Sequence, residues 1–149
     1  MSSPRKLVLD ANILLRAVFG NKVYILLKQY EDVAEFYAPD LCIEEARRNI
    51  PSIAARRQMA PTQAEAILQE VVGGFVHIVD SSLYEEYEER ARARISSRDA
   101  DDWPVVATAL LIDAPIWTED QDFFGSGIAT WTSNKIELFL RDIERPSGF

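Results

Sequence analysis

Short apolar segments alternate with helical patterns along the sequence, and this alternation constrains the fold more than any other feature. The segments are too short for helices and have the composition of buried strands. They are residues 6–9, 35–38, 75–79, 116–118 and 128–131. Strands that are joined through helices form parallel sheets, because each connection must cross the sheet. The sequence therefore predicts a three-layer α/β/α sandwich with a central parallel sheet, formed by one domain over residues 1–149.

Residues with known helix-end preferences predict where the helices begin and end. Asp40 is expected to cap the helix after the second strand, and Pro51 is expected to kink or divide it. Two capping boxes are expected to open the next two helices. They pair Thr62 with Glu65 and Ser82 with Glu85. The first of these helices is expected to end at residues 73–74, where two glycines follow each other.

The composition excludes several classes of protein. The net charge of −8 argues against a simple electrostatic nucleic-acid binder, which is normally basic. The only histidine, His77, excludes a zinc site with several histidines, and the only cysteine, Cys42, excludes an intrachain disulfide. The apolar runs are shorter than the ~20 residues of a membrane span. We therefore expect a cytoplasmic protein with no membrane segment.

Carboxylates stand at the ends of predicted elements that are far apart in the sequence. Ligands of parallel α/β sheets bind beyond the carboxyl ends of the strands, so these acids are expected to converge. Ligand sets made only of oxygen favour magnesium or manganese over zinc. Two such ions ~4 Å apart would hold the attacking and the leaving oxygen of a phosphodiester. The residues concerned are Asp10 with Asn12, Glu44 with Glu45, Asp101 with Asp102, and Asp120 with Asp122.

Each acid taken alone also has a purely structural interpretation. Asp10 and Asp101 are explained as helix caps, and Glu44 as a solvent-exposed charge. Asp122 is explained as the cap of the turn before Phe123. It is the four regions taken together that favour a metal site.

Four stretches of the sequence resemble the PIN-domain nucleases, and they occur in the order of that family's motifs. The stretches are residues 7–14, 38–45, 102–110 and 118–123. The resemblance implies a PIN-like fold and a ribonuclease that hydrolyses single-stranded RNA with Mg²⁺ or Mn²⁺. It most often implies the toxin of a VapC-type toxin–antitoxin pair. An antitoxin protein and a homodimer are then the expected partners besides RNA.

The resemblance also implies roles for individual residues. The acids that it assigns to catalysis and metal binding are Asp10, Glu45, Asp102 and Asp120, with Asp122 as a further metal ligand. Asn12 matches the polar residue that supports the first aspartate. Thr118 matches the hydroxyl that orients the fourth acid.

Arginine patches supply candidate phosphate contacts in spite of the overall acidity. RNA binding is expected at Arg47 and Arg48. Further candidates are Arg56 with Arg57, and the group Arg90, Arg92, Arg94 and Arg98. The alternative is that such arginines pair with nearby glutamates on an exposed face, which is the interpretation favoured for Arg90 and Arg92.

Other chemically distinctive residues are expected to be structural. His77 fits a core or edge position of a strand, and Cys42 fits a small buried apolar site. Trp103, Trp117 and Trp131 fit the core or an interface better than a base-stacking role.

Two other functions remain open. A haloacid-dehalogenase-like phosphatase or a receiver domain would use the aspartate after the first strand as a nucleophile. The phosphatase would need a second aspartate where Asn12 stands, and both would need a lysine after a late strand. A PIN-like module that binds RNA or protein without catalysis would not need the full set of acids.

Overall fold

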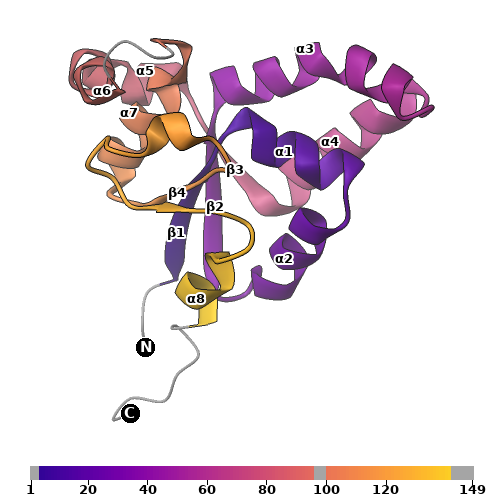
Figure 1. Cartoon of the computed structure of the whole chain (residues 1–149), viewed down its shortest axis with the longest axis horizontal. Coiled ribbons are helices and arrows are strands. Elements are labelled where there is room, and N and C mark those ends of the chain that lie inside the picture. The colour runs from indigo at the N-terminus through magenta and orange to yellow at the C-terminus, as the bar shows by residue number, and fades with distance from the viewer. Residues whose placement is uncertain (1–3, 96–99, 142–149) are drawn as a thin grey trace.

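The computed structural model describes residues 4–95 and 100–141, and these residues form a parallel sheet with helices on both sides (Figure 1). The strands are β1 (Arg5–Leu9), β2 (Ala34–Pro39), β3 (Val76–Val79), β4 (Ile116–Trp117) and β5 (Thr130–Trp131). Their order in the sheet is β3-β2-β1-β4-β5, and every neighbouring pair is parallel. The predicted parallel sheet is therefore confirmed.

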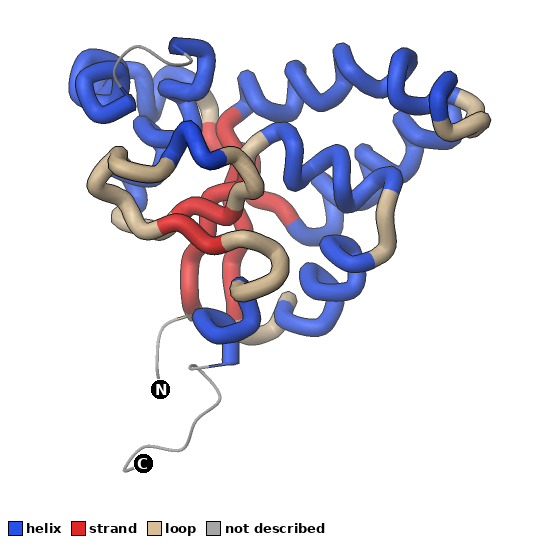
Figure 2. The backbone as a smooth tube through the Cα atoms, viewed as in Figure 1, coloured by secondary structure: helices blue, strands red, loops and turns tan. Residues whose placement is uncertain are grey.

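The helices form the two outer layers of the sandwich (Figure 2). They are α1 (Ala11–Phe19), α2 (Lys22–Tyr30), α3 (Asp40–Arg56), α4 (Pro61–Phe75), α5 (Ser81–Tyr84), α6 (Glu88–Ile95), α7 (Trp103–Ile112) and α8 (Ile136–Arg141). Helix α7 packs on β1, β2 and β4, with α5 and α6 against it. Helices α1, α3 and α4 pack on one another at the other side of the sheet, and α2 packs on α1. The predicted three-layer architecture is confirmed.

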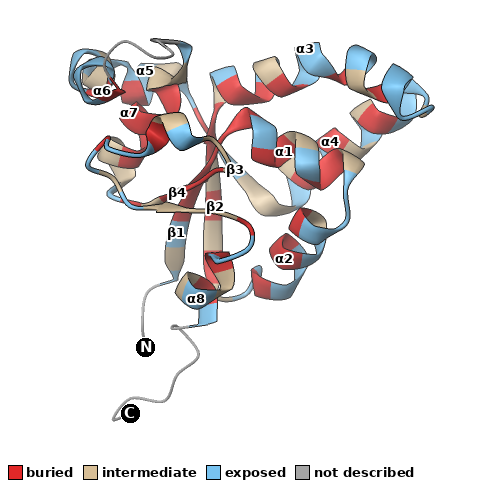
Figure 3. Cartoon of the chain, in the orientation of Figure 1, coloured by how far each residue is buried: buried red, intermediate tan, exposed pale blue. Residues whose placement is uncertain are grey.

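The second half of strand β1 is deeply buried in the sheet. Leu7, Val8 and Leu9 are all fully buried, whereas Lys6 near the start of the strand is exposed (Figure 3). A strand covered on both faces has apolar side chains at successive positions, and this explains the continuous apolar run. Asp10 follows the strand directly and is itself buried.

The sheet order places a topological switch point between β1 and β4. The chain proceeds from β1 to β2 and β3 on one side, and β4 and β5 lie on the other side. In parallel α/β sheets the crevice at such a point lies beyond the carboxyl ends of the two strands. Here those ends are Leu9 and Trp117, so Asp10 and Thr118 are the first residues to reach it.

Helix α3 differs from its sequence-based description. The helix runs without interruption across Pro51, and Asp40 is its first residue, not a residue outside it. The Asp40 carboxylate accepts hydrogen bonds from the Ser81 backbone N–H at 3.0 Å and from the Tyr84 hydroxyl at 2.7 Å. Tertiary contacts to α5 therefore hold the start of α3.

Neither predicted capping box forms. Ala60 occupies the N-cap position of α4 and makes no side-chain cap, while Glu65 pairs with Arg47 on α3. At α5 the cap is Asp80, whose carboxylate accepts the Ser82 N–H at 3.0 Å. Helix α4 also continues through the two glycines to Phe75, because its packing on α1 and β3 outweighs their weak helix propensity. Among the described residues, no helix is long and apolar enough to cross a membrane.

Truncating the buried side chain of Leu7 tests how much β1 contributes to stability. Leu7 is 0% exposed, so Leu7→Ala should lower the free energy of unfolding by about 3 kcal/mol through lost burial and a residual cavity. Ile25 is 56% exposed on α2, so the control Ile25→Ala should change it by less than about 0.5 kcal/mol. Urea unfolding of both variants measures the difference. Equal losses would contradict the central position of β1.

Candidate active site

Asp10 links the end of β1 to the start of α1. It is the N-cap of α1, and its Oδ1 accepts the Ile13 N–H at 2.9 Å. Its Oδ2 accepts a hydrogen bond from the Thr118 hydroxyl, which lies beyond the end of β4. Only 6% of the residue is exposed. The carboxylate is thus held on both oxygens in a mostly dehydrated position.

Thr118 joins the two strands that flank the switch point. Its buried hydroxyl donates to Asp10 and accepts the Asp120 backbone N–H at 2.9 Å. Its own N–H donates to the Trp131 carbonyl of β5 at 3.0 Å. One side chain therefore sets the positions of two of the predicted acids. The role that the resemblance implies for Thr118, orienting the fourth acid, stays a prediction.

A tight turn after β4 presents two further carboxylates. Asp120 caps the 3₁₀ turn Gln121–Phe123, because its Oδ1 accepts the Asp122 N–H at 2.9 Å. Phe123 is fully buried and anchors the turn to the core. Asp120 and Asp122 are consequently both half-buried and lie side by side.

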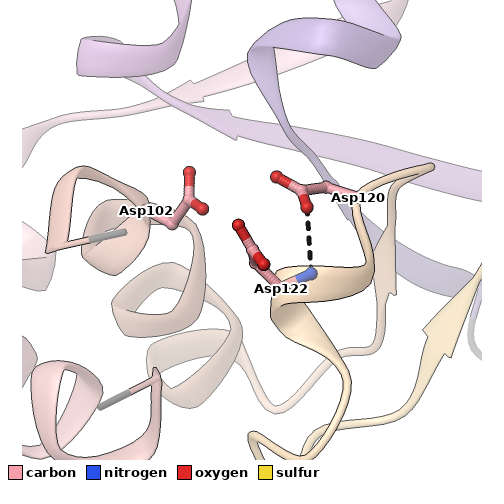
Figure 4. A group of neighbouring side chains, drawn as sticks. All are labelled: Asp102, Asp120 and Asp122. Carbon is pink, nitrogen blue, oxygen red and sulfur yellow. Dashed lines mark hydrogen bonds between the residues drawn. The ribbon is translucent and has the colours of Figure 1, made fainter. Parts of the chain in front are cut away.

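Asp102 faces this turn from the start of α7, as Figure 4 shows. One carboxylate oxygen each of Asp102, Asp120 and Asp122 lies within 4.8 Å of the other two. Asp102 makes no side-chain cap to α7, so its carboxylate is directed at the turn and not at its own helix. Asp101 is exposed and is not one of the three. The geometry thus distinguishes Asp102 from its neighbour.

Aromatic packing holds Asp102 in place. The neighbouring Trp103 ring meets the Tyr84 ring edge-on, with centroids 5.6 Å apart. The Arg92 guanidinium lies over the same tryptophan, 5.5 Å from its centroid. The Tyr84 hydroxyl donates to Asp40, so α3, α5 and α6 all support the start of α7.

Glu45 completes the group from the first turns of α3. It is half-buried, whereas Glu44 points to solvent. The pKa of Asp10 is raised from 3.8 to about 6, and burial is the main cause. The hydrogen bonds from Thr118 and Ile13 lower the pKa, and repulsion from Asp120 and Glu45 raises it. The four regions of acids that the sequence singled out therefore lie around one place.

Cys42 lies among these acids as a buried apolar side chain. Burial raises the pKa of its thiol well above the usual value, and the charges of Asp10, Glu45 and Asp102 raise it further. A thiol held in its protonated form is a poor nucleophile. The expectation that Cys42 is structural is consistent with this environment.

The supporting role of Asn12 and the RNA-binding role of Arg47 and Arg48 stay predictions, and the structure shows where these side chains lie. Asn12 is exposed, and its side-chain oxygen accepts the Arg16 Nε–H at 3.0 Å. Arg47 is paired with Glu65, at 2.6 Å between Nε and Oε1, while Arg48 is exposed. The side-chain hydrogen bond to the Asp10 carboxylate comes from Thr118.

Arg90, Arg92 and the aromatic residues singled out from the sequence lie in ion pairs, in ring contacts or in the core. Arg92 pairs with Glu88 at 2.8 Å, as expected, whereas Arg90 lies over the Tyr87 ring. His77 is exposed on edge strand β3 and packs against Tyr37, with ring centroids 5.0 Å apart. Trp117 is buried in the core, and Trp103 and Trp131 are half-buried against it. Arg98 lies outside the described residues.

Arg94 has a role that the sequence did not reveal. Its Nη1 donates to the Ser126 carbonyl at 2.9 Å, which ties α6 to the loop that carries Asp120 and Asp122. Gly127, at φ +83°, allows the close approach, because a Cβ there would lie 2.5 Å from Nη1. In the sequence, the glycines at 125 and 127 indicate a turn with positive φ angles. No pattern in the sequence identifies Arg94 as the residue that binds this turn.

The donor set fits a hard divalent cation. Three carboxylates within reach of one another, with Asp10 and Glu45 beside them, offer only oxygen ligands and a strongly negative local charge. Oxygen ligands are those that magnesium and manganese prefer. The residues present therefore suit Mg²⁺ or Mn²⁺ and do not suit a zinc site of histidines and thiolates.

A parallel α/β/α sandwich with carboxylates gathered at its switch point is the architecture that defines a class of nucleases. The model of the PIN domain matches residues 8–141, and the chain belongs to this family. PIN domains are generally nucleases. A search of curated proteins by sequence finds no match.

Solved structures confirm the fold. The VapBC2 structure from Rickettsia felis, bound to a DNA fragment from its promoter, is similar with a TM-score of 0.68 and 14% identity, over 85% of this chain and 98% of that chain. PAE2754 from Pyrobaculum aerophilum has a TM-score of 0.70 and 16% identity, over 93% and 90% of the two chains. A toxin-antitoxin complex from Klebsiella pneumoniae has a TM-score of 0.57 and 17% identity, over 85% and 97%.

The raised pKa of Asp10 predicts how stability depends on pH. Between pH 3.8 and about 6 the folded protein binds more protons at this residue than the unfolded chain does, so stability falls as pH rises through this window. The full loss is about 3 kcal/mol. In chelator, Asp10→Asn should remove this dependence while its side-chain oxygen still caps α1.

Melting curves of both proteins between acid and neutral pH measure the effect. The variant should melt higher than the wild type at neutral pH, and the advantage should shrink toward pH 4. Parallel pH profiles for the two proteins would show that Asp10 is an ordinary cap.

Proposed function

We propose that the protein is a metal-dependent endoribonuclease that hydrolyses phosphodiester bonds in single-stranded RNA. The observation that carries the proposal is the group of Asp102, Asp120 and Asp122, whose carboxylate oxygens lie within 4.8 Å of one another in a chain of the PIN-domain family. Asp10, which is buried, and Glu45, which is half-buried, lie next to this group and support the same function.

Asp102, Asp120 and Asp122 are the residues that would hold the cation, with Asp10 and Glu45 adding negative charge beside it. When bound, Mg²⁺ or Mn²⁺ supplies positive charge that acidifies water and offsets the charge of a phosphodiester. The fit rests on the all-oxygen donor set of the three carboxylates that lie within reach of one another.

The chain's own residues preorganise these carboxylates. The Thr118 hydroxyl holds Asp10 and the Asp120 backbone together, and Asp120 in turn holds Asp122. Trp103 fixes Asp102 through its contact with Tyr84. Because these contacts exist before substrate arrives, little reorganisation is needed during the reaction.

We further propose that the protein is the toxin of a toxin–antitoxin pair, acting in the cytoplasm as a homodimer with an antitoxin partner. Structures with the same fold support this proposal, since they include a VapBC2 complex and a toxin-antitoxin complex. Copurification of the chain with the product of an adjacent small open reading frame would test it.

Geometry argues against the rival phosphoryl-transfer classes. A phosphatase or receiver domain needs the aspartate after the first strand as a free nucleophile. Here Asp10 is 6% exposed, and both of its carboxylate oxygens accept hydrogen bonds. A non-catalytic module would not require carboxylates to be gathered against their mutual repulsion, since that arrangement costs stability in the absence of a cation.

Cleavage should depend on the metal. Single-stranded RNA should be cut with magnesium or manganese and left intact with excess chelator, and added metal should restore cutting. Gel analysis of a labelled RNA measures this. Equal cutting in chelator would rule out the metal mechanism, and loss of cutting with every divalent metal would favour the non-catalytic module.

Asp102 and Asp101 form a matched pair of variants. Asp102→Asn should lower cleavage by roughly 100-fold or more. Residues that only orient metal ligands already cost up to about 100-fold when they are replaced, and Asp102 is proposed as a ligand itself. Asp101→Asn removes the same charge from an exposed position and should keep most of the activity. Both variants should melt close to the wild type. The reverse ranking would show that the geometric assignment of Asp102 is wrong.

A further inference from the structure

A groove of about 520 Å³ lies along α1, beside the acid group but outside it. Its walls come from α1, from the start of α2, from the end of α3 and from the loop after β5. The polar and aromatic residues that matter here are Asn12, Arg16, Phe19, Lys22, Arg56 and Arg57. None of the acids of the candidate active site lines it.

The groove has the opposite charge to the rest of the molecule. Arg16, Lys22, Arg56 and Arg57 line it, and no described aspartate or glutamate does so, although the net charge of the chain is −8. None of these four cations takes part in an ion pair between described residues. Their positive charge is therefore available to a ligand.

The bonds that these side chains do make are to neutral oxygens. Lys22 Nζ donates to the Asn134 side chain at 2.6 Å, and Arg57 donates weakly to the Phe19 carbonyl at 3.4 Å. Arg16 donates to the Asn12 side chain. Such contacts orient the cations along the walls without neutralising them.

The groove and the acid group share one helix. Asp10 caps the start of α1, and the groove lining begins at Asn12 and continues to Gly20 at the other end. A helical rise of 1.5 Å per residue gives about 15 Å from Asp10 to Gly20. A linear ligand that leaves the acid group along α1 would therefore enter the groove directly.

We propose that this groove binds the sugar-phosphate backbone of the single-stranded RNA whose phosphodiester lies at the acid group. The inference rests on the proposed ribonuclease function. A phosphodiester chain carries a charge on every nucleotide, which suits cations distributed along the walls. The half-buried Phe19 ring offers a surface on which a base stacks.

The test compares two double variants that remove the same charge. Arg56→Gln/Arg57→Gln alters the groove. Lys6→Gln/Lys28→Gln alters two exposed lysines that do not line it, on β1 and on the later part of α2. Binding of a labelled single-stranded RNA of about 12 nucleotides is measured by fluorescence anisotropy in chelator, where no metal-dependent cutting occurs, over a range of salt concentrations.

The slope of the logarithm of the binding constant against the logarithm of the salt concentration is negative, and it should be shallower by about 1.4 in the groove variant. Each lost phosphate contact to a single strand contributes about 0.7 to this change. The same slope implies roughly 25-fold weaker binding at 0.1 M salt. The lysine control should retain the slope of the wild type. Melting temperatures close to that of the wild type exclude a folding defect in either variant.

Three outcomes would overturn the groove assignment. One is an unchanged slope in the groove variant, and another is an equal change in the lysine control. The third is displacement of the RNA by an acidic peptide of the same charge as effectively as by unlabelled RNA, which would indicate a protein ligand. If the slopes behave as expected but no protein cuts RNA with metal, the groove stands and the nuclease proposal fails.

Discussion

The hydrogen bond from the Thr118 hydroxyl to Asp10 is the contact on which the arrangement of the acids depends. It connects the ends of β1 and β4 across the switch point of the sheet. The same hydroxyl accepts the Asp120 N–H, so the turn with Asp120 and Asp122 takes its position from β1. Burial keeps this bond away from water, and the same burial raises the pKa of Asp10. The burial that protects this hydrogen bond is therefore also the main reason why the Asp10 carboxylate is costly to ionise.

The parallel sheet explains why residues so far apart in sequence meet. Asp10 and Thr118 follow paired strands, Glu45 follows β2 on the next helix, and Asp102 stands at the end of α7 that faces the same edge. The groove along α1 extends from this edge with the opposite charge. A strongly acidic chain therefore presents both a cation site and a cationic surface, because the distribution of charge and its sum are independent properties.

Local patterns in the sequence were sufficient for the sheet, for most helices and for the convergence of the acids. They were insufficient where a tertiary contact replaced a local one. Ser82 has a glutamate three positions later, as a capping box requires, yet Asp80 caps α5. Thr62 has Glu65 three positions later, yet Glu65 pairs with Arg47, so this contact joins α4 to α3. The side-chain hydrogen bond to Asp10 comes from Thr118, 108 positions away. Spacing along a chain predicts neighbours on one element and cannot identify partners contributed by another.

The loop after β4 is attached to the rest of the protein at several separate points. Thr118 holds its start, Phe123 is inserted in the core, and Arg94 holds the carbonyl of Ser126. Loops generally open at a lower free energy than the core strands that they border. The carboxylates of Asp120 and Asp122 can therefore separate from Asp102 while every strand stays paired. Dispersal of the acid group and unfolding of the sheet are then distinct events.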